Sequence, residues 1–289
     1  MPGPSTLGPY VRHLRLPFQL SLAPLFLWGA WLADGTATVA TLGGFAALHL
    51  FLYPAATAFN SVYDRDEGPV GGMLAPPPVP PRLAALAAAL ALAGLALAAA
   101  VGPGFFLLYG LIALIAFAYS HPSVRWKARP FASALAVAVG QGAFGFLAGG
   151  AAMANPAWSL STVFTGAAAA ALATLGLYPV TQIYQVEEDR ARGDRTLAVV
   201  LGPGRALVLG ALCLAAAGAV LAWLVGDRAG AGSAFAAAAG FALVAALQLR
   251  LARALASDRL DPRTSWRRAM RLNALAAAGS LAFLAWQAL

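Results

Sequence analysis

Most of the acidic residues of this chain fall in two short clusters. The first cluster runs from Asn60 to Glu67, and the second runs from Gln185 to Asp194. Their side chains offer carboxylate and amide oxygens, with no histidine or cysteine among them. Such ligands suit Mg²⁺, which binds a few carboxylates and keeps its other positions for water and substrate phosphates. The two clusters therefore predict a shared magnesium site, provided that the fold brings them together.

The spacing within each cluster places its polar groups on one helical face. Asn60 and Asp64 lie four residues apart, as do Gln185 and Asp189, and residues at this spacing are neighbours on a helix surface. Acids at a helix C-terminus oppose the helix dipole, and acids near lipid are costly unless they are paired or bind a metal. A second interpretation remains open, in which each cluster pairs with the arginines beside it in the sequence.

The elements that must carry these clusters are apolar helices. The chain has 289 residues, of which 61% are hydrophobic and 10% charged, whereas soluble domains carry about 25% charged residues. Apolar runs long enough to cross a bilayer, roughly 20 residues each, recur throughout the chain. We therefore predict a single all-α membrane domain over residues 1–289 with nine transmembrane helices, at 15–34, 37–62, 82–101, 104–120, 131–152, 158–184, 205–225, 230–250 and 268–288.

The basic residues predict how these helices are oriented. Nine crossings with a cytoplasmic N-terminus place 18 of the 19 Lys and Arg residues on the cytoplasmic side, leaving only Arg228 on the other. Cytoplasmic loops are enriched in Lys and Arg. Both acidic clusters then face the cytoplasm, and we expect an integral protein of a bacterial-type inner membrane in contact with its lipids.

Composition also excludes other kinds of site. The formal net charge of +8 does not indicate nucleic-acid binding, because the basic residues lie between apolar runs, as they do in membrane proteins. Cys213 is the only cysteine, which excludes a disulfide within the chain and a metal site made of cysteines.

Three segments carry longer sequence patterns. They read NSVYDRDEG over residues 60–68, YSHPSVRWK over 119–127 and QVEEDRARGDRTL over 185–197. The first and third resemble the two aspartate-rich motifs of the UbiA superfamily of membrane prenyltransferases, which lie on the second and sixth helices of that family. The middle segment is similar to the family's Tyr-Ser/Thr-x-Pro segment, with a basic residue in the same loop. The resemblance covers the first six helices, and the last three by topology.

Each acidic motif departs from the family pattern at one position. Gly68 stands where the family has the last aspartate of the first motif, and Gln185 stands where it has the first aspartate of the second. Asp66 and Glu67 are candidates to replace the carboxylate missing from the first motif, and Glu188 is the candidate in the second. These departures leave the number of bound Mg²⁺ ions open.

The resemblance implies nine helices around a central cavity open to the cytoplasmic side. It implies transfer of a prenyl group from an isoprenyl diphosphate to a hydrophobic or aromatic acceptor, in lipid-quinone or related isoprenoid biosynthesis. Mg²⁺ would act as a Lewis acid on the diphosphate as it leaves.

The resemblance also assigns roles to residues of this chain. Asn60, Asp64 and Asp189 are the expected catalytic residues, and Arg65, Arg125 and Lys127 are expected to bind the diphosphate. The expected metal ligands are Asp64, Asp66, Glu67, Gln185, Glu188 and Asp189. Further candidates for the site are Asp194, Tyr119, Gln141 and Tyr184.

Two other functions remain open at this point. The same scaffold could quench the prenyl cation internally, as a terpene cyclase does, or hydrolyse the diphosphate. The altered motifs also allow a non-catalytic protein that binds isoprenoid lipids.

Overall fold

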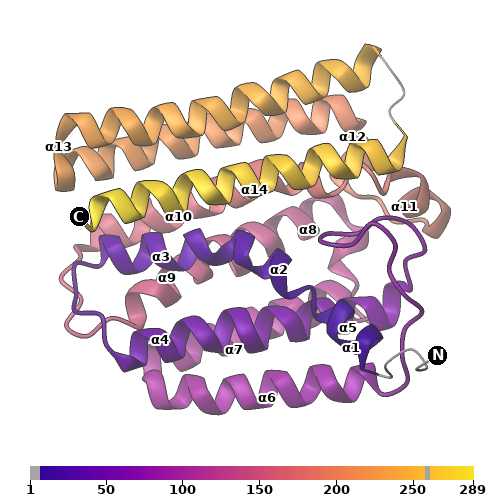
Figure 1. Ribbon diagram of the computed structural model, residues 1–289, viewed down its shortest axis with the longest axis horizontal. Helices are drawn as coiled ribbons and strands as arrows, with labels where there is room; N and C mark the ends of the chain where they lie inside the picture. Colours follow the sequence, from indigo (N-terminus) through magenta and orange to yellow (C-terminus); the bar gives the residue numbers. More distant parts are fainter. Residues whose placement is uncertain (1–6, 258–260) are drawn as a thin grey trace, which may run out of the picture.

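The computed structural model describes residues 7–257 and 261–289, and its regular structure is helical, with only isolated β-bridges besides (Figure 1). This confirms the predicted all-α architecture. The elements in chain order are α1 (Gly8–Leu14), α2 (Leu16–Gln19), η1 (Leu20–Leu22), α3 (Ala23–Leu32), α4 (Val39–Ala46), η2 (Ala47–Leu52), α5 (Tyr53–Asp64), α6 (Leu83–Val101), α7 (Pro103–Ser120), η3 (Trp126–Ala128), α8 (Pro130–Ala136), η4 (Val137–Ala143), α9 (Phe144–Ala151), α10 (Leu160–Leu177), η5 (Tyr178–Thr181), α11 (Val186–Arg192), α12 (Leu197–Leu201), α13 (Pro203–Ser257) and α14 (Pro262–Gln287).

Seven helical stretches among the described residues are long and apolar enough to cross a membrane, so the chain is an integral membrane protein. Two of them combine several elements, since α4, η2 and α5 run together over Val39–Asp64, and α8, η4 and α9 over Pro130–Ala151. The predicted first span at 15–34 is divided into α2, η1 and α3. Pro17 and Pro24 lie at the starts of α2 and α3, where proline is tolerated because the first turn of a helix has no partner for its N–H groups.

One of the seven stretches, within α13, contains two of the predicted helices. Gly230 interrupts α13 with a φ of 82°, a left-handed conformation that glycine adopts without steric cost. The two halves fold back side by side (Figure 1), and a methyl group on Gly218 would lie 2.6 Å from Cβ of Phe241 in the other half. The chain therefore turns back at the position where the sequence predicts a break between two helices.

The sixth predicted helix ends earlier than expected. The sequence predicts 158–184, but α10 ends at Leu177 and the 3₁₀ turn η5 at Thr181. Pro179 lacks the N–H that would continue the α-helical ladder. The second acidic cluster consequently lies mostly on a separate short helix, α11, rather than at the end of the sixth helix.

Glycines allow close contact between helices near the centre of the molecule. A methyl group on Gly149 of α9 would collide with the carbonyl oxygen of Phe26 in α3, and one on Gly29 would collide with that of Phe146. Gly142 lies against α10 in the same way, with Ala170 O 2.8 Å from the position of its missing Cβ. Small residues at such interfaces let helix backbones approach.

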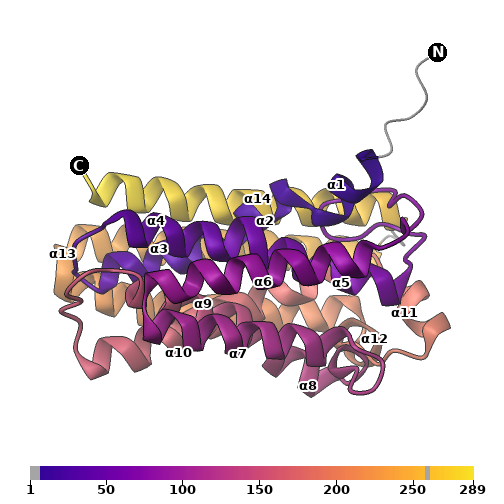
Figure 2. The same cartoon turned by 90° about the horizontal axis from the view of Figure 1, so that it is seen from below.

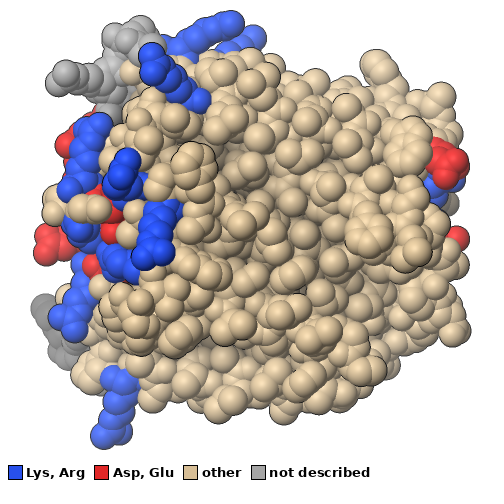
Figure 3. Space-filling model, turned by 180° about the vertical axis from the view of Figure 1, so that it is seen from behind, with Lys and Arg blue, Asp and Glu red and all other residues tan. Residues whose placement is uncertain are grey.

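The first and last parts of the chain pack together and close the bundle. Helix α14 runs along α3 (Figure 2), and the rings of Trp28 and Phe283 stack with centroids 5.1 Å apart. Charge is concentrated at the two ends of the molecule (Figure 3), with most of the Lys and Arg at one end. At the other end Arg228 forms an ion pair of 2.7 Å with Asp34.

Candidate active site

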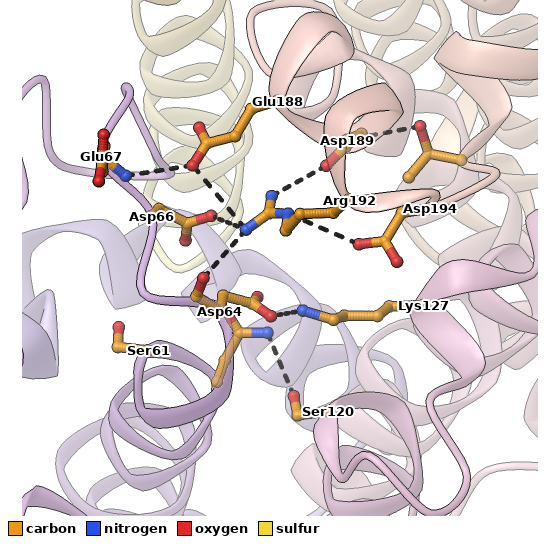
Figure 4. Close-up of polar contacts among 12 residues, drawn as sticks. Ser61, Asp64, Asp66, Glu67, Ser120, Lys127, Glu188, Asp189, Arg192 and Asp194 are labelled. Carbon is orange, nitrogen blue, oxygen red and sulfur yellow. Dashed lines mark hydrogen bonds and ion pairs between the residues drawn. The ribbon is translucent and has the colours of Figure 1, made fainter.

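The fold brings the two acidic clusters together, as the sequence predicts. They meet through Arg192 of α11, whose Nη1 donates to Asp66 Oδ1 at 2.6 Å and whose Nη2 donates to Asp189 Oδ1 at 3.1 Å (Figure 4). A second link is made by the backbone N–H of Glu67, which donates to Glu188 Oε1 at 3.1 Å. The end of α5 and the helix α11, more than 120 residues apart in sequence, thus form one polar site.

The carboxylate of Asp64 points into this site from the last turn of α5. It forms an ion pair with Lys127, which lies in η3 between α7 and α8. One turn earlier on α5, Asn60 Nδ2 donates to Ser120 Oγ at 3.2 Å. The expected pair Asn60 and Asp64 therefore shares a face, and both residues line the same cavity as Lys127.

Asp189 is held rigidly on α11. Besides Arg192, the hydroxyl of Thr196 donates to its Oδ2 at 3.2 Å, and the backbone N–H of Asp194 donates to its carbonyl at 2.8 Å. Burial raises the pKa of the Asp189 carboxyl above its ordinary value, against the opposing effect of Arg192. The side chain thus has two donors fixing its direction toward the cavity, which it lines.

The carboxylate of Asp194 binds Arg125, in the loop between α7 and α8. The guanidinium of Arg125 binds its carboxylate in a forked geometry, with N–H···O distances of 3.0 to 3.1 Å. Arg125 has a φ of 47°, so this non-glycine residue adopts a left-handed backbone conformation at the site. Forked arginine–carboxylate bonds are among the stronger charge-assisted hydrogen bonds.

The predicted site residues divide into those at the cavity and those outside it. The side chains of Arg65 and Glu67 are exposed and do not line the cavity, and the half-buried Arg125 and Glu188 do not line it either. Arg65 ends α5 in a left-handed conformation, which turns the chain away from the helix axis. The predicted residues that line the cavity are Asn60, Asp64, Asp66, Tyr119, Lys127, Gln141, Tyr184, Gln185, Asp189 and Asp194.

The alternative pairing of each cluster with its adjacent arginines is found only in part. Arg190 does pair with Glu187 at 3.5 Å, at the exposed surface. Asp66, however, binds Arg192 of the other cluster instead of Arg65. The arginine at the centre of the site is therefore Arg192, for which the sequence analysis predicted no role. Its spacing of three from Asp189 is the signal that could have indicated it.

Gly68 lies beside the carboxylate of Glu188. A methyl group on Gly68 would lie 2.8 Å from Glu188 Oε2. The carboxylate of Glu188 thus occupies the space where a side chain at position 68 would lie. We expected Glu188 to replace the carboxylate missing at Gln185; its carboxylate lies beside Gly68, and its role stays a prediction.

The polar site opens into a cavity of about 460 Å³. Its polar end holds the acidic residues, and its walls continue along apolar side chains that include Trp28, Leu221, Phe241 and Phe283. Two tyrosines lie near the boundary, where the hydroxyls of Tyr119 and Tyr178 are 2.9 Å apart. The cavity is therefore polar at one end and apolar along its length, which suits an amphiphile with an anionic head and a hydrocarbon tail.

Comparison with known proteins identifies the family. The family model described as the UbiA prenyltransferase family matches residues 22–275. The chain belongs to the UbiA prenyltransferase family. No sequence among curated proteins matches this UbiA-family chain.

Solved structures of UbiA homologues share its fold. A UbiA homologue from Archaeoglobus fulgidus bound to Cd²⁺ superposes with a TM-score of 0.67 at 20% identity, over 96% of this chain and 100% of that one. The same organism's homologue bound to GPP and Mg²⁺ gives 0.66 at 22%, over 96% and 100%. The apo structure of a homologue from Aeropyrum pernix K1 gives 0.63 at 25%, over 92% and 97%.

Proposed function

We propose that this protein transfers a prenyl group from an isoprenyl diphosphate to a hydrophobic acceptor of aromatic type, in lipid-quinone or related isoprenoid biosynthesis. The observation that carries the proposal is the shared cavity, which Asp64 and Asp189 line at its polar end and apolar side chains line along its length. The family and the homologue that binds GPP and Mg²⁺ support the same reaction class.

The donor set fits Mg²⁺, because it consists of carboxylate and amide oxygens. Asp64 and Asp189 would hold the ion, with Asn60 and Gln185 offering amide oxygens from the cavity wall. Bound Mg²⁺ would stabilise the negative charge that develops on the diphosphate as it leaves.

The chain's own cations would bind the diphosphate. Lys127 and Arg125 approach from the loop between α7 and α8, and both already contact carboxylates of the site. Arginine binds phosphate oxygens in pairs, whereas lysine acts as a point charge. The apolar wall would hold the prenyl tail, and the rings of Tyr119 and Tyr178 would face the developing allylic cation at the boundary.

The orientation in the membrane belongs to the same proposal. We place the polar site on the cytoplasmic side of a bacterial-type inner membrane, with nine crossings. In this arrangement α2 to α3 supply the first crossing and the two halves of α13 supply the seventh and eighth. The concentration of Lys and Arg at the polar end of the molecule supports this orientation.

The test is release of pyrophosphate and formation of prenylated product by the purified protein in zwitterionic nanodiscs. Geranyl, farnesyl and geranylgeranyl diphosphates would be supplied with a panel of aromatic acceptors, with and without Mg²⁺. Asp64→Asn and Asp189→Asn are each expected to lower turnover by at least 100-fold. Asp34→Asn, at the opposite end of the molecule, is the matched control and should retain activity. Equal activity in all variants would contradict the proposal.

One observation favours a second candidate, binding of isoprenoid diphosphates without turnover. Five acidic side chains at the polar end, those of Asp64, Asp66, Glu188, Asp189 and Asp194, already have a cationic partner in this structure. The same assay separates the two functions, since a binder would retain the diphosphate but release no pyrophosphate. Product formed from the diphosphate alone, without acceptor, would instead identify a cyclase or hydrolase on this scaffold.

A further inference from the structure

Arg192 is the cation around which the polar site is built. Its guanidinium lies between the two acidic segments, bonded to Asp66 and Asp189, and its Nη1 also donates to the backbone carbonyl of Asp64 at 3.2 Å. Carboxylates of Glu188 and Asp194 lie 3.9 and 3.8 Å from it. One guanidinium therefore contacts oxygens from both segments at once (Figure 4).

A divalent ion placed between Asp66 and Asp189 would need the oxygens that Arg192 binds. Asp66 and Asp189 are the carboxylates that face each other across the gap, and each points an oxygen at Arg192. A metal ion cannot share that space with a guanidinium, because like charges repel strongly at such distances in a partly buried site.

We infer that Arg192 takes the place of a second divalent ion, so that this protein binds diphosphate with one metal ion instead of a metal pair. The inference rests on the proposed function, since it concerns the metal of that same site. Asp64 and Asp189 hold the single ion. The guanidinium supplies the other positive charge and ties α11 to the end of α5.

The experiment is a Mn²⁺ titration followed by electron paramagnetic resonance, with inorganic pyrophosphate present and the protein in zwitterionic nanodiscs. The wild-type protein should bind one Mn²⁺ per chain with the six-line spectrum of an isolated ion. Arg192→Gln should bind two and show exchange coupling between neighbouring ions. Arg192→Lys keeps the charge and should stay mononuclear, as should Arg190→Gln, which removes the neighbouring exposed arginine.

An exchange-coupled pair in the wild-type protein would overturn the inference, and this measurement does not depend on whether a variant folds. A folded Arg192→Gln protein that remains mononuclear would overturn it as well. If the wild-type protein binds no Mn²⁺ even with pyrophosphate, the proposed function itself fails, and the inference fails with it. If the wild-type protein binds more than one Mn²⁺ per chain, the inference fails but the proposed function stands.

Discussion

At the scale of single residues, the site is defined by which side chain occupies which space. Glu188 and Gly68 show this most directly, because the carboxylate of one fills the space that a side chain on the other would need. Glu188 is further fixed by the backbone N–H of Glu67. The carboxylate of Glu188, from the second acidic segment, thus lies beside the position where the first segment has Gly68.

This arrangement predicts a reciprocal effect of two substitutions. Gly68→Asp should lower Mg²⁺-dependent prenyl transfer about tenfold or more, because its carboxylate would press against Glu188. Glu188→Ala should lower it too, because the site loses a carboxylate. The double variant should recover much of the activity, with a coupling of about 1–3 kcal/mol, as found for residues in contact. The measurement is kcat/KM of the four proteins.

The control for this cycle is Glu187→Ala, which removes an exposed carboxylate beside Glu188. It should leave kcat/KM within about twofold. Strictly additive losses in the Gly68 and Glu188 cycle would show that the two positions do not share one space.

At the scale of elements, helix interruptions place the site. Pro179 ends α10 early, so the second acidic cluster forms its own short helix and can turn toward α5. Gly230 folds α13 back on itself. In the centre of the bundle, Gly29 and Gly149 let α3 and α9 approach so closely that backbone meets backbone. Helix α3 carries Trp28, so this contact also sets the position of one cavity wall.

Two glycine substitutions are expected to have opposite effects on stability. Gly149→Ala should destabilise the protein by about 1–3 kcal/mol, because its methyl group collides with the Phe26 backbone and the contact must open. Gly240→Ala, in the cavity wall with no atom within 4 Å of the missing Cβ, should be neutral or stabilising by up to about 1 kcal/mol. Thermal unfolding in the same detergent measures both. A Gly149→Ala protein as stable as Gly240→Ala would contradict the close packing of α3 and α9.

At the scale of the whole molecule, charge separates the two ends of the bundle. The acidic site and most of the Lys and Arg share one end, and the Asp34–Arg228 pair lies at the other (Figure 3). In a bilayer, these two ends must lie in opposite aqueous phases, because the belt between them is apolar. We therefore expect the polar site to be accessible from one side of the membrane only.

Cysteine labelling in intact cells would determine that side. Arg228→Cys should react with a membrane-impermeant maleimide added outside the cells. Arg267→Cys, exposed at the start of α14, should react only after the membrane is permeabilised. The wild-type protein is the background control, since its one cysteine lies within α13. The reverse labelling pattern would place the polar site outside.

The sequence by itself determined the features that depend on local pattern. Hydrophobic length predicted apolar helices, and the fold confirms them as the main elements. The spacing of Asn60 and Asp64, and of Gln185 and Asp189, predicted shared faces, and all four residues line the cavity. The motifs at residues 60–68 and 185–197 indicated the family that the comparison then established. These inferences succeed because they depend only on residues close together in the sequence. Helix periodicity decides which of them share a face, and membrane thickness decides how long an apolar helix must be.

Only the tertiary structure decided which charges meet. The central role of Arg192, the exposure of Arg65 and the placing of Glu188 beside Gly68 all depend on how the end of α5 lies against α11. Those segments are separated by more than 100 residues, and their relative position follows from glycine contacts and helix interruptions across the whole bundle. Ion pairing is governed by distances of a few ångströms between elements, and no local pattern in the chain fixes such distances.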